Sequence, residues 1–125
     1  MLSFLQLAPD GLDDGRLTAA EMFGLPLTGT RLVVLSACET GLSHVTAGNE
    51  ALGMSRALLY AGAGSLVLSG WQVSSQASGA WMRAFYEAAR TRPIKDSARE
   101  AAARVRADPE TRHPFYWAAF SVLAR

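Results

Sequence analysis

The chain has 125 residues, of which 50% are hydrophobic and 18% are charged, a composition typical of one compact globular domain over residues 1–125. Twelve basic residues against eleven acidic ones, without a basic tract, argue against a nucleic-acid partner. No apolar run reaches the roughly 18 residues that span a membrane, no signal peptide is visible, and a single cysteine forms no internal disulfide. We therefore expect a cytoplasmic protein. Alanine is abundant, and almost all of the basic residues are arginine, so we also expect a bacterial source.

A short apolar segment opens the chain, and residues 9–26 read as a connector. Residues 3–8 are apolar enough for a strand, but no earlier element is available to pair with it. Residues 9–11 and 13–15 have the composition of turns. Thr18 and Glu21 have the spacing of a capping box, which predicts a brief helix ending near Gly24.

The middle of the chain has the pattern of a strand, a helix and a second strand. Residues 31–36 read RLVVLS, a run of the kind that is buried on both faces of a parallel sheet. Asn49 is a suitable cap for a helix that extends to about Ala61, and residues 65–69 read SLVLS. This order predicts two parallel strands joined by a helix.

The last third of the chain is predicted to contain two helices and one more strand. Residues 76–90 place their aromatic and apolar side chains on one helical face. Pro93 suits the start of the next helix, which should end at Asp108 because Pro109 follows. Residues 116–124 are aromatic and apolar, which favours a third core strand.

Cys38 follows the 31–36 strand by two residues, which places it at the carboxyl edge of the predicted sheet. Open α/β folds carry their reactive groups at that edge. A lone cysteine is also a common small core residue, and its position alone does not decide between the two interpretations.

Four segments occur in one order: LVVLSACETGL, GNEALG, ALLYAGAGSLVLSGWQV and HPFYWAAFSVL. Together they resemble the C-terminal portion of the CHAT family of caspase-like cysteine peptidases, over about residues 13–123. The resemblance implies an α/β, three-layer caspase-like sandwich with a mainly parallel sheet that is incomplete at its N-terminal side. It also implies that Cys38 is the nucleophile of a Cys–His dyad.

The partner histidine of that dyad is missing from the expected context. In the family it lies in a His-Gly motif after an earlier strand, and this sequence contains no such motif. His44, six residues after Cys38, is the alternative base if its loop folds back, and a solvated loop histidine otherwise. His113 precedes Pro114, and we interpret this pair as structural. A thiol with an ordinary pKa of about 8.5 is a poor nucleophile without a base.

The segment after the second strand predicts the substrate-binding residues. Related peptidases have acidic residues after a Trp-x-Val sequence, whereas this chain has Trp71, Val73, Ser74 and Ser75 there. Loss of those acids disfavours a basic substrate side chain. We assign Gly70, Trp71, Val73 and Ser75 to substrate binding. The serines are also suitable N-caps for the following helix.

Two functions stay open. In the first, the chain is the cysteine-bearing half of a CHAT peptidase that is inactive alone and cleaves a protein or peptide substrate once a missing N-terminal half or a partner chain supplies the histidine. In the second, it is a non-catalytic interaction or assembly module. We expect no metal and no organic cofactor, because potential ligands are not clustered. An open sheet edge beside residues 31–36 predicts self-association.

Overall fold

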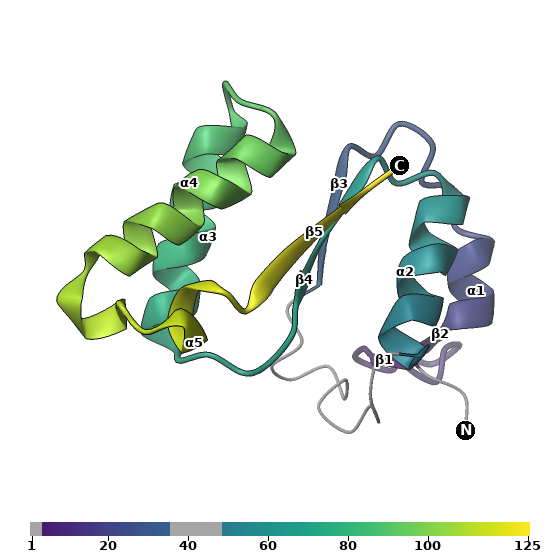
Figure 1. The fold of residues 1–125 in the computed structure, drawn as a ribbon. Helices are drawn as coiled ribbons and strands as arrows, with labels where there is room; N and C mark the ends of the chain where they lie inside the picture. Colours follow the sequence, from purple (N-terminus) through teal and green to yellow (C-terminus); the bar gives the residue numbers. More distant parts are fainter. Residues whose placement is uncertain (1–3, 36–48) are drawn as a thin grey trace.

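A computed structural model describes residues 4–35 and 49–125 of the chain, which form an α/β fold (Figure 1). The N-terminal elements are strands β1 (Phe4–Gln6) and β2 (Arg16–Thr18), helix α1 (Ala19–Phe23) and strand β3 (Leu32–Leu35). They are followed by α2 (Asn49–Ala61), β4 (Ser65–Ser69), α3 (Ser75–Ala89) and α4 (Ile94–Ala107). A short 3-10 helix (Pro109–Thr111), α5 (Pro114–Trp117) and β5 (Phe120–Ala124) complete the chain. None of the helices in these ranges is long and apolar enough to cross a membrane.

The main sheet has the strand order β3-β4-β5. Strands β3 and β4 are parallel, with Leu35 opposite Leu68, and α2 connects them, so the predicted strand–helix–strand unit is confirmed. Strand β5 is antiparallel to β4, with Phe120 opposite Ser69. Within the described residues the sheet is therefore mixed, with one parallel and one antiparallel pair.

Both faces of the sheet are covered by helices. Because side chains alternate along a strand, Leu66 and Val67 of β4 point to opposite faces, and both are fully buried. Leu66 belongs to a cluster with Met54 and Leu58 of α2, and Val67 to a cluster with Trp81 of α3. Figure 1 shows the same division, with α1 and α2 on one side of the sheet and α3 and α4 on the other.

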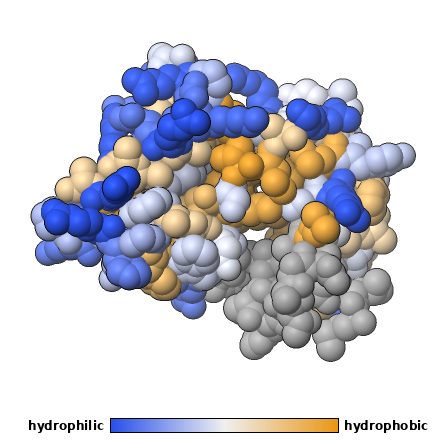
Figure 2. Space-filling view, viewed as in Figure 1, coloured by the Kyte–Doolittle hydropathy of each residue, from blue (hydrophilic) through white to orange (hydrophobic). Residues whose placement is uncertain are grey.

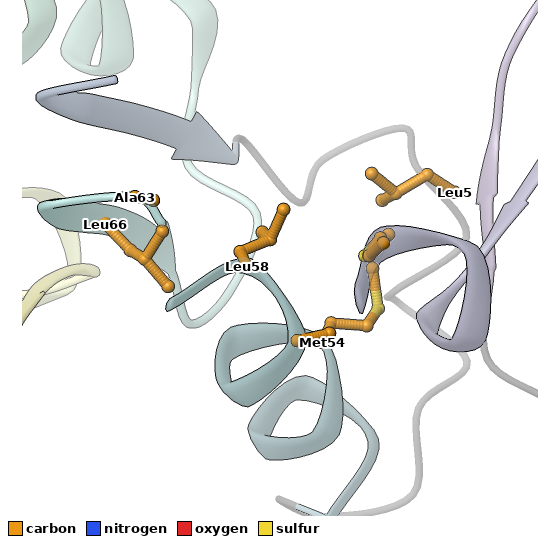
Figure 3. Close-up of a cluster of buried hydrophobic side chains, with 7 residues drawn as sticks. Leu5, Met54, Leu58, Ala63 and Leu66 are labelled. Carbon is orange, nitrogen blue, oxygen red and sulfur yellow. The ribbon is translucent and has the colours of Figure 1, made fainter. Parts of the chain in front are cut away.

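The cluster on the α1–α2 side consists of aliphatic side chains and methionine. Figure 3 shows these side chains converging from β1, α2 and β4. The buried members are Leu5, Met22, Met54, Ala57, Leu58, Ala63 and Leu66. Thioether side chains adapt to irregular gaps, which suits a site where a short hairpin, two helices and a sheet meet.

The cluster on the α3–α4 side is aromatic. The Trp81 ring stacks on Phe85 with centroids 5.0 Å apart, and on Phe120 of β5 at 4.3 Å. Its other buried members are Val67 of β4, Ala84 of α3, and Ala101 and Val105 of α4. Helix α4 thus packs through small residues, which lets it approach α3 closely.

The possible strand over residues 3–8 is confirmed as β1, but the expectation that it has no partner and is followed by a connector is wrong, because residues 4–18 form a hairpin. Strands β1 and β2 are antiparallel, with Phe4 opposite Thr18. Gly15 adopts a φ of 78°, and a Cβ atom there would lie 2.5 Å from the Leu7 carbonyl oxygen, so the loop requires glycine. Strand β2 is too short for a periodic signal, which is why its pairing with β1 was not predicted.

The predicted capping box is confirmed. Thr18 Oγ1 accepts a hydrogen bond from the Glu21 amide at 3.2 Å, and Glu21 Oε2 accepts one from the Thr18 amide at 2.7 Å. Helices α3 and α4 agree with the predicted segments to within one or two residues, and Asp108 ends α4.

The third core strand was predicted to begin at residue 116, but β5 begins at Phe120. Tyr116 and Trp117 lie in α5, whose first residue is Pro114. The Trp117 indole nitrogen donates a hydrogen bond to the Arg112 carbonyl at 3.0 Å. Proline at the first helical position and this local bond favour a helical turn over an extended start.

Candidate active site

Cys38 and His44 lie outside the described residues, so their roles stay predictions. The structure does describe the end of strand β3, which precedes their segment in the sequence. Strand β3 ends at Leu35, three residues before Cys38 in the sequence, and its last residue lies opposite Leu68 of β4. Because the two strands are parallel, the chain leaves β3 beside the point where β4 continues into residues 70–75.

Residues 70–75 are connected to the C-terminal part of the chain by specific bonds. The Gly70 amide donates to the Ala119 carbonyl at 2.6 Å. The Trp71 indole nitrogen donates to the Phe115 carbonyl at 2.8 Å, and the two rings stack with centroids 6.2 Å apart. Trp71 is 40% exposed and Phe115 is 45% exposed. An aromatic pair with one open surface therefore borders the carboxyl end of β4.

Val73 fixes the same segment to the core through its buried side chain. Its side chain is buried with Ala77 and Ala119, whereas Gly70, Trp71 and Ser75 are exposed. Of the four predicted substrate-binding residues, three are thus accessible and Val73 fixes the backbone that carries them. Their assignment to substrate binding stays a prediction.

The two serines of this segment differ in their contacts. Ser74 is the N-cap of α3, and its hydroxyl accepts a hydrogen bond from the Ala77 amide at 3.3 Å. Ser75 is the first residue of the helix and is exposed. The predicted capping role therefore belongs to Ser74.

His113 has the structural position that was predicted for it. It is the N-cap of α5, where Nδ1 accepts a hydrogen bond from the Phe115 amide at 3.1 Å. This bond orients Phe115, whose carbonyl holds Trp71. His113 therefore acts on the candidate site through Phe115.

Two buried polar atoms lie on the face of α3 that follows this segment. Ser78 Oγ and Trp81 Nε1 have no hydrogen-bond partner in the part of the chain that the structure describes. They are three residues apart, so they share one helical face. The Trp81 ring stacks on both Phe85 and Phe120, and these two contacts explain why its orientation is maintained without this hydrogen bond.

Residues 70–75 carry no charge, because this segment contains no acidic or basic side chain. No group of three or more potential ligands that could hold a metal ion occurs within residues 4–35 and 49–125. What the described part of the site offers to a substrate is therefore backbone groups, hydroxyls and an aromatic surface.

Phe115 is the residue of this region that sequence reasoning missed. It lies between a His-Pro pair that was interpreted as structural and the predicted last strand, and it was assigned no role. The pairing with Trp71 joins residues 44 positions apart, and no local pattern reports such a contact.

Comparison with protein families gives one assignment. The model of the CHAT domain matches residues 1–125. The chain belongs to the CHAT domain family. The match includes the whole N-terminal hairpin, whereas the predicted range of about 13–123 excluded its first strand. A comparison with curated proteins gives no match. CHAT domains are peptidase-like and are grouped with the caspase-like cysteine peptidases.

Proposed function

We propose that this CHAT domain carries the nucleophile of a cysteine peptidase, with Cys38 at the carboxyl edge of a three-layer caspase-like sandwich. Membership of the family supports this function. The observation that carries it is the parallel register of β3 and β4, because Leu35 lies at the sheet edge three residues before Cys38. A mainly parallel sheet would require further strands beside β3, whose far edge has no partner strand among the described residues.

The chemistry needs a proton acceptor beside the sulfur. A base removes the Cys38 thiol proton, the thiolate attacks the peptide carbonyl, and the same group then protonates the leaving amine. Water hydrolyses the resulting thioester and regenerates the thiol. We propose that the histidine comes from another segment or from a partner chain, so that the chain is inactive alone. His44 is the alternative base within the sequence.

Substrate selection rests on the segment that follows β4. Gly70, Trp71 and Ser75 are exposed beside the sheet edge, and the buried Val73 holds their backbone in place. Because residues 70–75 contain no carboxylate, nothing in this segment would pair with a lysine or arginine side chain. We propose a protein or peptide substrate with an uncharged residue at the cleavage site, in the cytoplasm of a bacterium.

A non-catalytic assembly module is the second candidate function. It is favoured by the unpaired far edge of β3 in the described sheet, since an exposed edge can accept a strand from another chain. In this function Cys38 has no catalytic role.

Imidazole rescue separates the two functions. The chain is incubated with a peptidyl coumarin amide that has an uncharged residue before the scissile bond, with and without imidazole. The peptidase function expects hydrolysis only with imidazole and only when Cys38 is present, with Cys38→Ala as the blank. No difference between the chain and Cys38→Ala at any imidazole concentration assigns the chain to the assembly function.

The rate of Cys38 alkylation by iodoacetamide against pH decides the source of the base. Without a base in the chain, the apparent pKa should lie near the ordinary value of about 8.5. An apparent pKa below about 8 that returns to this value in His44→Ala would assign the base to His44. Cys38→Ala is the blank, because any alkylation that persists in this variant does not come from the Cys38 thiol.

A further inference from the structure

Strand β5 forms an open edge of the main sheet. It pairs with β4 on one side, and no other strand of the described residues pairs with it. No helix crosses β5 in the view of Figure 1. Figure 2 shows hydrophobic side chains gathered in the middle of the same face, over β5, beside the hydrophilic surface of α4. The residues of β5 that contribute to this apolar surface are the half-buried Phe120, Val122 and Leu123.

The hydrogen bonds at the two ends of β5 establish which backbone groups point to this edge. The Gly70 amide donates to the Ala119 carbonyl at 2.6 Å, and the Arg125 amide donates to the Gly64 carbonyl at 3.2 Å. Both residue pairs continue the β4–β5 register. Bonded and non-bonded pairs alternate along an antiparallel ladder, so every second residue of β5 turns its N–H and C=O groups away from β4. These outward residues are Phe120, Val122 and Ala124.

Nothing in the sequence of β5 protects this edge. Edge strands of soluble proteins are commonly blunted by charged side chains, by proline or by a bulge. The sequence FSVLA contains no charged residue and no proline. Its residues pair with β4 in an unbroken register, so the strand contains no bulge either. The edge is therefore suited to pairing with a further strand.

We propose that two copies of this chain associate through β5, paired as antiparallel strands about a two-fold axis at Val122. In this register Val122 lies opposite Val122 of the second copy, and Phe120 lies opposite Ala124 of the second copy. The outward N–H groups of each strand then meet the outward C=O groups of the other, and no outward group of the three residues stays unpaired. The interface is closed, because the same surface of both copies is used.

The side chains of β5 are complementary to themselves in the same register. On the α3–α4 face, the large Phe120 ring lies opposite the small Ala124 of the second copy, with the two Val122 side chains between these pairs. On the α1–α2 face, Leu123 lies opposite the smaller Ser121. Phe120 and Val122 already pack on the aromatic cluster and Leu123 on the aliphatic one, so the dimer continues both clusters across the axis. This self-complementarity is the reason for a second copy as the partner.

Sedimentation velocity of the full chain over a concentration series tests this dimer. We expect a reversible equilibrium between monomer and dimer. Ala124→Pro should weaken it by about 10-fold or more, because proline lacks the outward N–H and leaves the Phe120 carbonyl of the second copy unpaired. Ala124→Ser keeps this N–H and is the matched control, which should associate like the unaltered chain. Ala124 is exposed and its N–H points away from β4, so both variants should fold, which far-UV circular dichroism checks.

Cysteine cross-linking tests the register. In a Cys38→Ala background, Ser121→Cys in one variant and Leu123→Cys in another each provide a single thiol. The two positions lie directly opposite across the proposed dimer, with Cα atoms about 4.5 Å apart, which a disulfide can bridge. Two copies of the same variant place their thiols only diagonally, about 7–8 Å apart. Under mild oxidation the mixture should therefore form disulfide-linked dimers several-fold faster than either variant alone.

Three outcomes overturn the proposal: a monomer at every concentration, an association that Ala124→Pro leaves unchanged, or a mixture that cross-links no faster than its separate variants. Association that persists in Ala124→Pro indicates instead pairing through the β3 edge, which belongs to the assembly function above.

Discussion

The two faces of the β3–β4–β5 sheet are packed by different side chains. The face toward α1 and α2 is aliphatic and rich in methionine, with Met22 and Met54 fully buried. The face toward α3 and α4 is aromatic, with Trp81 between Phe85 and Phe120. The aromatic face continues toward residues 70–75, because Phe120 also packs against the small cluster of Val73, Ala77 and Ala119. The aliphatic face instead reaches Leu35 and Leu68 at the ends of β3 and β4. The aromatic face should therefore influence both stability and residues 70–75, and the aliphatic face should influence stability without moving residues 70–75.

The largest expected effect is that of Trp81→Ala. Removal of a buried tryptophan should lower the free energy of unfolding by about 3–5 kcal/mol, measured by urea denaturation. The same change should alter the NMR signals of the Trp71 indole and of the amides of residues 70–75, because Phe120 loses its stacking partner.

Met54→Ala is the matched change on the aliphatic face. It should cost about 2–5 kcal/mol by the same measurement, since Met54 is 1% exposed. The signals of residues 70–75 should stay in place. If Met54→Ala shifts those signals as much as Trp81→Ala does, the two faces are not functionally distinct.

A smaller effect is expected at the helix caps, one on each side of the sheet. Ser74→Ala removes the acceptor for the Ala77 amide, and Thr18→Ala removes half of the capping box. Each should lower the free energy of unfolding by about 0.5–2 kcal/mol. Only Ser74→Ala should also alter the Trp71 signals. A change in those signals of equal size in both variants would contradict the comparison.

The smallest expected effect is a local titration in the β1–β2 loop. Hydrogen bonds from the Leu12 and Asp13 amides lower the pKa of Asp10 below its ordinary value of 3.8. Because the pKa in the folded state is depressed, the stabilisation is present above this ordinary value and is lost as the pH falls through the folded one. The Leu12 and Asp13 amide shifts should therefore change with a midpoint below 3.8, and the change should disappear in Asp10→Asn. Residues 70–75 should not respond, and a midpoint above 3.8 would contradict these bonds.

Much of the fold could be predicted from local signals. The strand over 65–69 and the helix over 49–61 have the predicted bounds, because an apolar run and a helical periodicity are properties of adjacent residues. The capping box at Thr18 was visible for the same reason. The hairpin of β1 with β2 was not predicted, because it depends on contacts made after the chain folds back. The helical turn before β5 was missed although its signals are local, because the aromatic and apolar run over 116–124 was interpreted as one strand.

The candidate site, like the fold, could be predicted from the sequence only in part. The sequence by itself determined the CHAT family, the order of its motifs and the position of Cys38 after an apolar strand, although that strand is only half-buried in the described fold. Only the tertiary structure decided that Val73 is an anchor while Trp71 is exposed, and that Phe115 holds Trp71 by a bond across 44 positions. The physical reason is that a motif records which residues are present, whereas burial and pairing depend on the elements packed against them.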